Sequence, residues 1–375
     1  MIYLDYSANT PVDARVLEQF CAVERRCIGN ANSHHQAGSA AKAEIDAATI
    51  KIASLLGVQP AEIIYTSGAS EANNFALKGL ARLSRHAGRH IISTPLEHSS
   101  VSGTLTALQE QGYEIDLLDV KQDGTVDLEH LEALLRPDTI CVAVTLVDSE
   151  LGVMQPVQEI AAILKAYPHC HLHVDATQAV GKIPVSFEGV DTMSLTAHKF
   201  YGLNGIGLLV KRRNLALEPL IHGGESTTIY RSGTPTVALA SSLACALDLA
   251  VTDLPGRVDH VAKLNAELRA ALSTYPLVRI NSPEHAIPHV LNLSVRNVKG
   301  TVFQRELDAK GVCVSVKSAC SSDGLPSRAV FAVSRDRRNA LSSWRISLSH
   351  LTTEEEIKAF LQAFDVCYRE LTAVH

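Results

Sequence analysis

The chain has 375 residues, 46% hydrophobic and 20% charged, and this ordinary globular balance excludes a mainly disordered protein. Its length exceeds the usual size of one domain, so two packed domains are expected. The net charge of -6, with both signs interspersed, argues against direct nucleic-acid binding, which depends on clustered Lys and Arg.

The sequence also bears on location. No apolar run approaches the roughly 18 residues of a membrane span, and the first residues show neither a basic leader nor an apolar signal core. The eight cysteines are scattered, without a Cys-x-x-Cys pair. We therefore expect a cytoplasmic protein that does not contact a membrane.

Short β-branched runs alternate with helical patterns between about residues 60 and 210, which predicts βαβ units around a mainly parallel sheet of seven strands. The expected strands are 63–66, 91–93, 115–118, 140–146, 172–174, 192–195 and 206–210. Apolar residues at helical spacing predict helices that cover the sheet faces at 101–111, 127–136 and 155–166.

The pattern changes after Pro255 and predicts a smaller α+β domain at the C-terminal end. A helix is expected at 257–274 and a final helix at 352–371, and between them we expect strands near 277–280, 290–295, 312–316 and 344–348. We predict a large domain of residues 15–255 and a small domain of residues 1–14 and 256–375, which carries the Cys320 loop.

A candidate anion site lies at residues 66–71, TSGASE, where a strand ends and a helix begins. Backbone N–H groups and Ser hydroxyls can converge there on a phosphate at the helix N-terminus. An ordinary helix cap also explains such a turn, and this signal alone does not decide. A Walker loop is excluded because Ala176 stands where its first glycine belongs, and glycines 202, 205 and 207 follow the wrong order for a dinucleotide site.

Asp175 ends an apolar strand, at the edge where open α/β sheets place their ligands. A protonated pyridine nitrogen would pair with such a buried acid and become a better electron sink, although a helix-capping role is equally compatible with the position. His169, His171 and His173 share one face of the same strand, but they precede its functional end, so a metal site is the less favoured interpretation and no metal is expected.

Lys199 is the decisive element, because a strand end delivers it beside Thr196 and His198 into a glycine-rich turn. Burial there lowers the pKa of a lysine and frees its amine to form an imine with an aldehyde cofactor. Together with Asp175 and the candidate phosphate turn at residues 66–71, this position predicts pyridoxal 5'-phosphate, bound to Lys199 as a Schiff base.

Two further residues complete the candidate chemistry. Cys320 lies in a loop of small polar residues beside Lys317, where a thiol gains thiolate character. Arg345 interrupts an apolar strand, so its guanidinium needs a carboxylate, either a structural acid or the α-carboxylate of an amino acid.

These elements, in this order, resemble the cysteine desulfurases, which belong to the class V aminotransferase-like branch of the fold-type I pyridoxal-phosphate enzymes. The resemblance covers nearly the whole chain. It rests on YLDYSANTP at 3–11, Gly29-Asn30, TSGASE at 66–71, Glu97-His98, the Asp175 strand, His198-Lys199, RSGT at 231–234, Ser318-Ala319-Cys320 and Arg345.

The resemblance implies a role for each matching position. Lys199 is the Schiff-base lysine, His98 stacks on the cofactor ring, Asp175 pairs with the pyridinium nitrogen and Gln178 with the ring oxygen. Arg345 binds the substrate carboxylate with Asn30 nearby. The phosphate is held by Ala69, Ser70, Thr196, His198 and, from the neighbouring subunit of a homodimer, Thr234.

The implied reaction removes sulfur from L-cysteine and leaves L-alanine and a persulfide on Cys320. An acceptor protein then takes the sulfur for iron–sulfur clusters, thiolated tRNA or sulfur-modified DNA. Ser149 stands where the family commonly has a cofactor-touching Asn, and Lys317 where Gly is usual. Selenocysteine lyase or aminotransferase activity is the alternative, and a catalytically inactive interaction partner is a third hypothesis from a different class.

Overall fold

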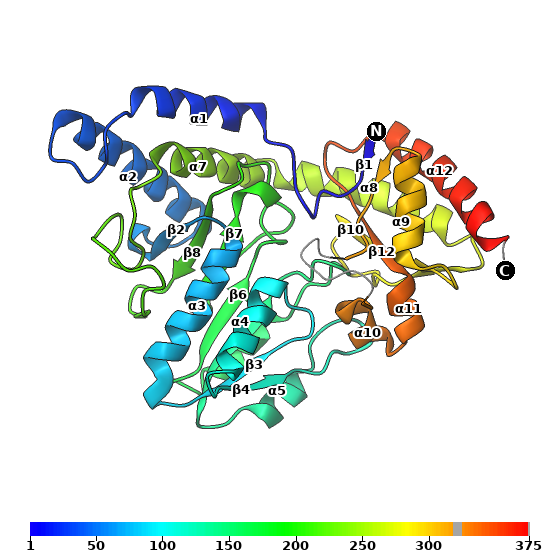
Figure 1. Cartoon of the computed structure of the whole chain (residues 1–375), viewed down its shortest axis with the longest axis horizontal. Coiled ribbons are helices and arrows are strands. Elements are labelled where there is room, and N and C mark those ends of the chain that lie inside the picture. Colours follow the sequence, from blue (N-terminus) through cyan, green and yellow to red (C-terminus); the bar gives the residue numbers. More distant parts are fainter. Residues whose placement is uncertain (318–324, 374–375) are drawn as a thin grey trace.

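The computed structural model describes residues 1–317 and 325–373. The chain forms two lobes, one built around a large sheet and the other around β10 and β12, and the long helix α8 runs from the first lobe into the second (Figure 1). The catalytic cysteine predicted at position 320 lies outside the described residues.

The large sheet has seven strands in the order β2-β8-β7-β6-β5-β3-β4, and every pairing except those of β8 is parallel. The mainly parallel seven-stranded sheet is therefore confirmed, and each predicted strand is present within one or two residues of its expected ends. The strands are β2 (Ile63–Thr66), β3 (His90–Ser93), β4 (Glu114–Leu117), β5 (Thr139–Thr145), β6 (His171–Asp175), β7 (Thr192–Thr196) and β8 (Gly207–Lys211).

Helices pack on both faces of this sheet. On one face lie α3 (Ala69–Leu83) and α4 (Ser99–Gln109); the other is covered by α2 (Gln36–Leu56), α6 (Val157–Leu164) and α7 (Val237–Thr252). The helices α1 (Ala14–Arg26) and α5 (Leu128–Leu134) complete this lobe, with short 3₁₀ turns at Pro60–Glu62, Ser84–His86 and Ala197–Lys199. The helices α1, α2 and α7 were not predicted from the sequence.

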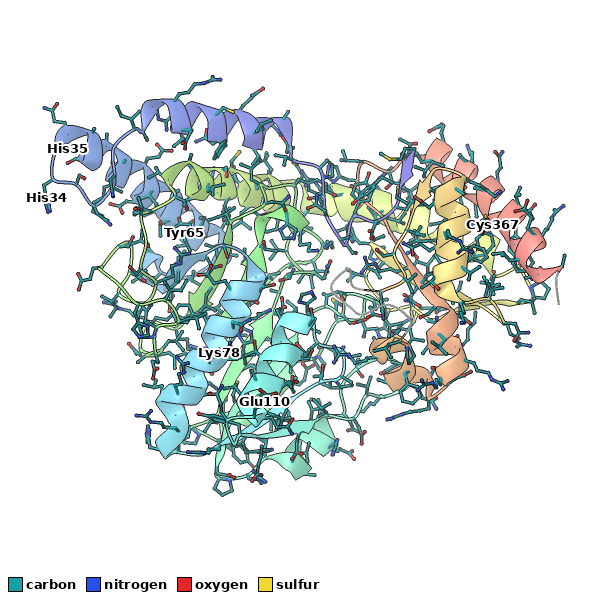
Figure 2. All side chains as sticks on the ribbon, viewed as in Figure 1. His34, His35, Tyr65, Lys78, Glu110 and Cys367 are labelled. Atoms are coloured by element: carbon teal, nitrogen blue, oxygen red, sulfur yellow. The ribbon has the colours of Figure 1, made fainter. Side chains whose placement is uncertain are left out.

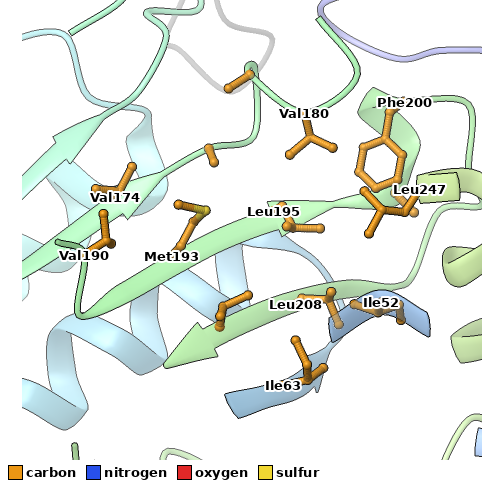
Figure 3. Close-up of a cluster of buried hydrophobic side chains, with 14 of the residues drawn as sticks. Ile52, Ile63, Val174, Val180, Val190, Met193, Leu195, Phe200, Leu208 and Leu247 are labelled. Carbon is orange, nitrogen blue, oxygen red and sulfur yellow. The ribbon is translucent and has the colours of Figure 1, made fainter. Parts of the chain in front are cut away.

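The strands divide their side chains between the two helical layers. Ile63 and Tyr65 of β2 pack in the cluster with α2 and α7, whereas Ile64 packs with α3 and α4, as the two-residue period of a strand requires. Figure 3 shows Leu195 of β7 and Leu208 of β8 on the same side of the sheet, near Leu247 of α7. Burial on both faces accounts for the continuous apolar runs of the central strands.

The second lobe holds a three-stranded antiparallel sheet, β12-β10-β9, and a two-stranded pairing of β1 with β11. Its strands are β1 (Ile2–Tyr3), β9 (Val278–Ile280), β10 (Val290–Val295), β11 (Val312–Cys313) and β12 (Ser343–Ser347). Its helices are α8 (Leu254–Leu272), α9 (Gly300–Ala309), α10 (Arg328–Ser334), α11 (Arg337–Ser342) and α12 (Glu354–Thr372).

The expected strand 312–316 is shorter than predicted, because only its first two residues pair with β1. Trp344, Phe303 and Phe364 form the aromatic centre of this lobe's core, to which the fully buried Cys367 of α12 also belongs (Figure 2). We propose the boundary between the domains at residue 255, because α8 packs its buried Val261 and Leu264 into this second core.

Among the described residues, no single helix has the length and apolar composition needed to cross a membrane. The pair α7 and α8 passes that test together, but it is bent by 65°.

Candidate active site

The candidate site is a cavity of about 330 Å³ at the carboxyl edge of the large sheet. Thr145, Asp175 and Thr196, the last residues of β5, β6 and β7, all line it, which agrees with the ligand position typical of open α/β sheets. Ten of the predicted site residues line this cavity: Ala69, Ser70, His98, Ser149, Asp175, Gln178, Thr196, His198, Lys199 and Arg345.

The phosphate turn, residues 66–71, lies at the same edge of the sheet. The strand β8 lies between β2 and β7 and is antiparallel to both, so β2 and β7 end at the same edge. Gly207 of β8 pairs with Thr66 on one side and Thr196 on the other. A Cβ at Gly207 would come within 2.7 Å of the Gly68 Cα, so glycine permits the turn to approach the sheet this closely. Gly68 caps α3 without a side-chain bond, and the first N–H groups of the helix remain for an anion.

The residues around the turn also fit a phosphate. Thr196 Oγ1 lies 3.1 Å from Nδ1 of His198, and both side chains line the cavity beside the start of α3. Burial, followed by the charges of Lys199 and Lys182, lowers the pKa of His198 to about 4, so the ring is neutral at pH 7. These groups supply hydrogen bonds rather than charge.

Both oxygens of the Asp175 carboxylate accept hydrogen bonds. Asn73 Nδ2 donates to Oδ2 at 2.8 Å, and the Thr177 N–H donates to Oδ1 at 2.9 Å. Only 4% of Asp175 is exposed to solvent. The residues that follow Asp175 form turns rather than a helix, so the Thr177 N–H bond closes a local turn and Asp175 caps no helix.

Lys199 follows β7 in a 3₁₀ turn, and the N-terminal segment of the chain packs against it. Its Nζ donates to the carbonyl oxygens of Ser7 at 2.7 Å and Ala8 at 2.6 Å. Thr10 fixes the same turn, because its Oγ1 donates to the His198 carbonyl and accepts from the N–H of Tyr201, which has a φ of 67°. The amine is thereby aimed into the cavity by residues almost 200 positions away.

His98 is the second titratable ring of the cavity. Burial is the main cause that lowers the pKa of His98 below its usual value. The charge of Asp175 opposes this shift, whereas the charges of Lys199 and Arg328 add to it. Its Nδ1 accepts from the Ser100 N–H at 3.2 Å, and it lies 2.9 Å from the Ser100 hydroxyl.

Gln178 is oriented by a buried lysine that the sequence analysis did not single out. Lys182 Nζ donates to Gln178 Oε1 at 2.8 Å, so the amide nitrogen is turned the other way and donates to the Ser7 carbonyl at 2.9 Å. Burial, and then the charges of Lys199 and Arg345, lower the pKa of Lys182 to about 7.

The Lys182→Met substitution is expected to raise the free energy of unfolding more at pH 6 than at pH 9. The gains at the two pH values should differ by about 1–3 kcal/mol, because one pKa unit corresponds to about 1.36 kcal/mol. In the unfolded chain the ammonium is protonated at both pH values. At pH 6 the folded protein must bury that charge, whereas at pH 9 the buried amine is neutral and the cost is smaller. Denaturant unfolding at the two pH values measures the difference. Lys165→Met, at an exposed position, is the control, and an equal effect of Lys182→Met at both pH values would contradict the prediction.

Arg345 reaches the cavity from β12 of the second lobe. Its Nη2 donates to Asp5 Oδ1 at 2.9 Å and its Nη1 to the Ser149 carbonyl at 2.8 Å, and only 2% of its side chain is exposed. Ser315 Oγ donates to the other Asp5 oxygen at 2.8 Å. The structural carboxylate considered in the sequence analysis is therefore present, while the guanidinium still lines the cavity.

Ser149 lies between two acids, the buried Asp148 and the partly buried Glu150. Burial, followed by the charge of Glu150, raises the pKa of Asp148 to about 7, and burial also raises the pKa of Glu150. Glu150 accepts a hydrogen bond from Ser327 at the start of α10. The turn thus joins the large sheet to the second lobe beside Arg345.

Two predicted residues lie elsewhere in this chain. Asn30 and Thr234 are exposed and do not line the cavity. Both therefore stay predictions, as does Cys320.

The histidines of β6 do not form a metal site. Both ring nitrogens of the fully buried His173 are occupied, by Thr192 at 2.9 Å and Asn73 at 3.0 Å. Within residues 1–317 and 325–373, no group of three His, Cys, Asp or Glu side chains is placed to hold a metal ion.

The donor set fits pyridoxal 5'-phosphate. The cavity combines a helix N-terminus for a phosphate, a fixed carboxylate for a pyridinium nitrogen and a lysine amine for an aldehyde. Thr177 Oγ1 and Arg345 Nε, on residues lining this cavity, are buried and have no hydrogen-bond partner in the described part of the chain. Buried polar atoms of this kind indicate a ligand site.

Comparison with known proteins decides the family. The model of the aminotransferase class-V family matches residues 2–360. The chain belongs to this family. A NifS/IcsS protein homolog of Lactobacillus delbrueckii subsp. bulgaricus is 36% identical over 100% of this chain and 99% of its own length. The cysteine desulfurase IscS of Proteus mirabilis is 40% identical over 95% of this chain and 90% of its own.

A solved structure described as a NifS-like protein superposes on this class-V chain with a TM-score of 0.91 and 36% identity, covering 97% of this chain and 98% of that one. The predicted fold of a fold-type I enzyme and the predicted cysteine desulfurase of the class-V family are thus confirmed. Dependence on pyridoxal phosphate is a trait of this family.

Several lining residues were not identified as site residues from the sequence. They are Ser7, Ala8, Leu96, Thr145 and Thr177. Ser7 and Ala8 belong to the quoted N-terminal motif, which was the available signal. Leu96 and Thr145 had no local signal, because only strand pairing brings them to the cavity edge.

Proposed function

We propose that this class-V enzyme binds pyridoxal 5'-phosphate in the cavity at the sheet edge and converts L-cysteine to L-alanine, with transfer of the sulfur to Cys320. The observation that carries the proposal is the convergence of Lys199, Asp175 and the N-terminus of α3 on one cavity. The names of the relatives, which include cysteine desulfurases, support the same reaction.

The cofactor, when bound, supplies an electron sink that weakens the carbon–sulfur bond of the substrate. Asp175 is the proposed partner of its ring nitrogen, and Gln178 of its ring oxygen. The phosphate is proposed to lie at the start of α3 against Ala69, Ser70, Thr196 and His198. Lys199 is the proposed attachment point, and the Ser7 and Ala8 carbonyls orient its amine between turnovers.

We assign the substrate carboxylate to Arg345, whose Nε is buried and lacks a partner in the described chain. The Arg345→Lys variant is expected to raise the KM for L-cysteine about 10- to 100-fold, with a smaller change in kcat. The reason is the loss of one charge-assisted hydrogen bond, worth about 1.5–3 kcal/mol. Steady-state alanine release measures both constants. Arg337→Lys is the control, and an unchanged KM for the Arg345 variant would exclude this role.

His98 and the released Lys199 amine are proposed to manage the proton transfers. The lowered pKa of His98 keeps its ring neutral at pH 7, and Ser100 occupies one of its nitrogens, so the other is available to the substrate.

Cys320 is proposed to accept the sulfur as a persulfide and to pass it to an acceptor protein. The exposed Thr234 is proposed to reach the phosphate site of a second copy of the chain, which makes the active unit a homodimer in the cytoplasm. Light scattering tests the dimer, and turnover of L-cysteine by a monomer would overturn the role of Thr234.

The direct test measures alanine released from L-cysteine by the purified protein loaded with pyridoxal phosphate. Mass spectrometry of the peptide that contains Cys320 should show an added sulfur atom after one turnover. Selenocysteine and an amino-acid and keto-acid pair are supplied in parallel. Selenocysteine as the only substrate would favour a lyase, amino transfer without loss of sulfur would favour an aminotransferase, and no turnover would leave an inactive partner.

A further inference from the structure

A buried polar network beneath the cavity joins two of the groups assigned to the cofactor ring. Asn73, on α3, is fully buried and does not line the cavity. Its Nδ2 donates to Asp175 Oδ2 at 2.8 Å and also to the Ser100 hydroxyl oxygen at 2.9 Å. Ser100 in turn contacts Nδ1 of His98. One amide group therefore connects Asp175 with His98.

The other side of the amide is equally constrained. Asn73 Oδ1 accepts from Nε2 of His173 at 3.0 Å and from the hydroxyl of Ser194. Burial lowers the pKa of His173, so its ring is neutral and its proton lies on Nε2, while Nδ1 accepts from Thr192. All four hydrogen-bonding positions of the amide are thus filled. A flipped amide would place its oxygen against the Asp175 carboxylate, so only one orientation is compatible with the network.

The same network fixes the proton of His98. The Ser100 N–H donates to His98 Nδ1 at 3.2 Å, so Nδ1 is an acceptor. The Ser100 hydroxyl oxygen accepts from Asn73 and lies 2.9 Å from Nδ1, so its own proton is available to donate to that nitrogen. The neutral ring therefore carries its proton on Nε2, the nitrogen left for the cavity.

We propose that Asn73 is a positioning residue that holds the Asp175 carboxylate and, through Ser100, keeps His98 in the Nε2–H form. This inference rests on the proposed function of the cavity, and it adds a residue that touches neither cofactor nor substrate. The charged groups that act on His98 are Asp175 of β6, Lys199 after β7 and Arg328 of α10, and the variants below leave all three in place.

Two variants of the cofactor-loaded protein test separately the link from Ser100 to His98 and the link from Asn73 to Asp175. Ser100→Ala removes only the hydroxyl that donates to His98. It should raise the pKa of His98 by about 0.5–1 unit, because a hydrogen bond that favours the neutral ring is lost, and it should leave cofactor affinity within about twofold of wild type. Asn73→Leu keeps the volume but removes both donors, so it should shift His98 similarly and also weaken cofactor binding about 10-fold or more.

Nitrogen NMR of histidine-labelled protein gives the protonation state and pKa of His98, with the resonance assigned by its loss in His98→Gln. Equilibrium dialysis gives the affinity for pyridoxal phosphate. Asn74→Ala, at the next position of α3, is the matched control and should change neither value. Should Asn73→Leu not fold, Asn73→Ser replaces it, since a short hydroxyl can restore at most part of the network.

An unchanged pKa of His98 in Ser100→Ala would contradict the proposed role of Ser100. Wild-type cofactor affinity in the Asn73 variant would contradict the proposed hold of Asn73 on Asp175. Alanine release by the wild-type protein is measured in the same preparations. Failure of the proposed function would appear as an inactive wild type, whereas failure of this inference would appear as unaltered variants beside an active wild type.

Discussion

The Lys199→Ala variant is expected to lose alanine release by about 10⁴-fold, together with the absorbance of the lysine-bound cofactor. Both losses have one cause, because the Nζ atom that reaches the cavity is proposed to form the link to the aldehyde and also to take part in proton transfer. The cavity itself should persist, since its walls come from the ends of β5, β6 and β7.

Absorbance spectra before and after addition of L-cysteine, with alanine quantified by chromatography, measure the effect. Lys165→Ala, at an exposed position of the same lobe, should behave as wild type. Unfolding in denaturant shows whether the Lys199 variant is folded. A folded Lys199→Ala protein that released alanine at the wild-type rate would exclude Lys199 as the attachment point.

The Cys320→Ala variant should keep the bound cofactor and its absorbance but lose sulfur transfer on the order of 10³-fold or more. Cys320 is not among the residues proposed to bind the cofactor, so the variant should lose sulfur transfer without losing cofactor binding. Sulfide release in the presence of a reducing thiol measures the transfer, and the persulfide on the peptide should disappear with the thiol.

Cys21→Ala is the matched control, because Cys21 is a free cysteine on α1, in the lobe of the large sheet, and does not line the cavity. It should retain both cofactor and turnover. If Cys320→Ala instead released sulfide and alanine as fast as wild type, a persulfide on this residue would be wrong and a selenocysteine lyase or aminotransferase would be favoured.

The strands and the order of the chemical motifs could be predicted from the sequence because both are local. An apolar run such as 140–146 can be recognised by composition alone, since a strand buried on both faces contains little else. Asp175 and Lys199 each stand at the end of such a run, and the sheet rule for ligand position then places both at one edge. The ends of the seven strands of the large sheet were predicted within about two residues for this reason.

The long N-terminal helix α2 was not specified, because its apolar pattern is weak. In α2 four of the six buried positions are glycine or alanine, which mark a helix face less clearly than larger side chains. The strand expected at 312–316 was too long, since its length is set by β1, a partner of only two residues from the opposite end of the chain.

By itself the sequence determined the fold class, the family and ten of the residues that line the cavity, because each of these follows from a local pattern or a motif. Only the tertiary structure decided the partners of those residues. Asp5 reaches Arg345 across 340 positions, Lys182 orients the Gln178 amide, and Asn73 joins Asp175 to Ser100. Hydrogen bonds have ranges of about 3 Å, so they depend on which strands and helices become neighbours, and no spacing along the chain encodes that distance.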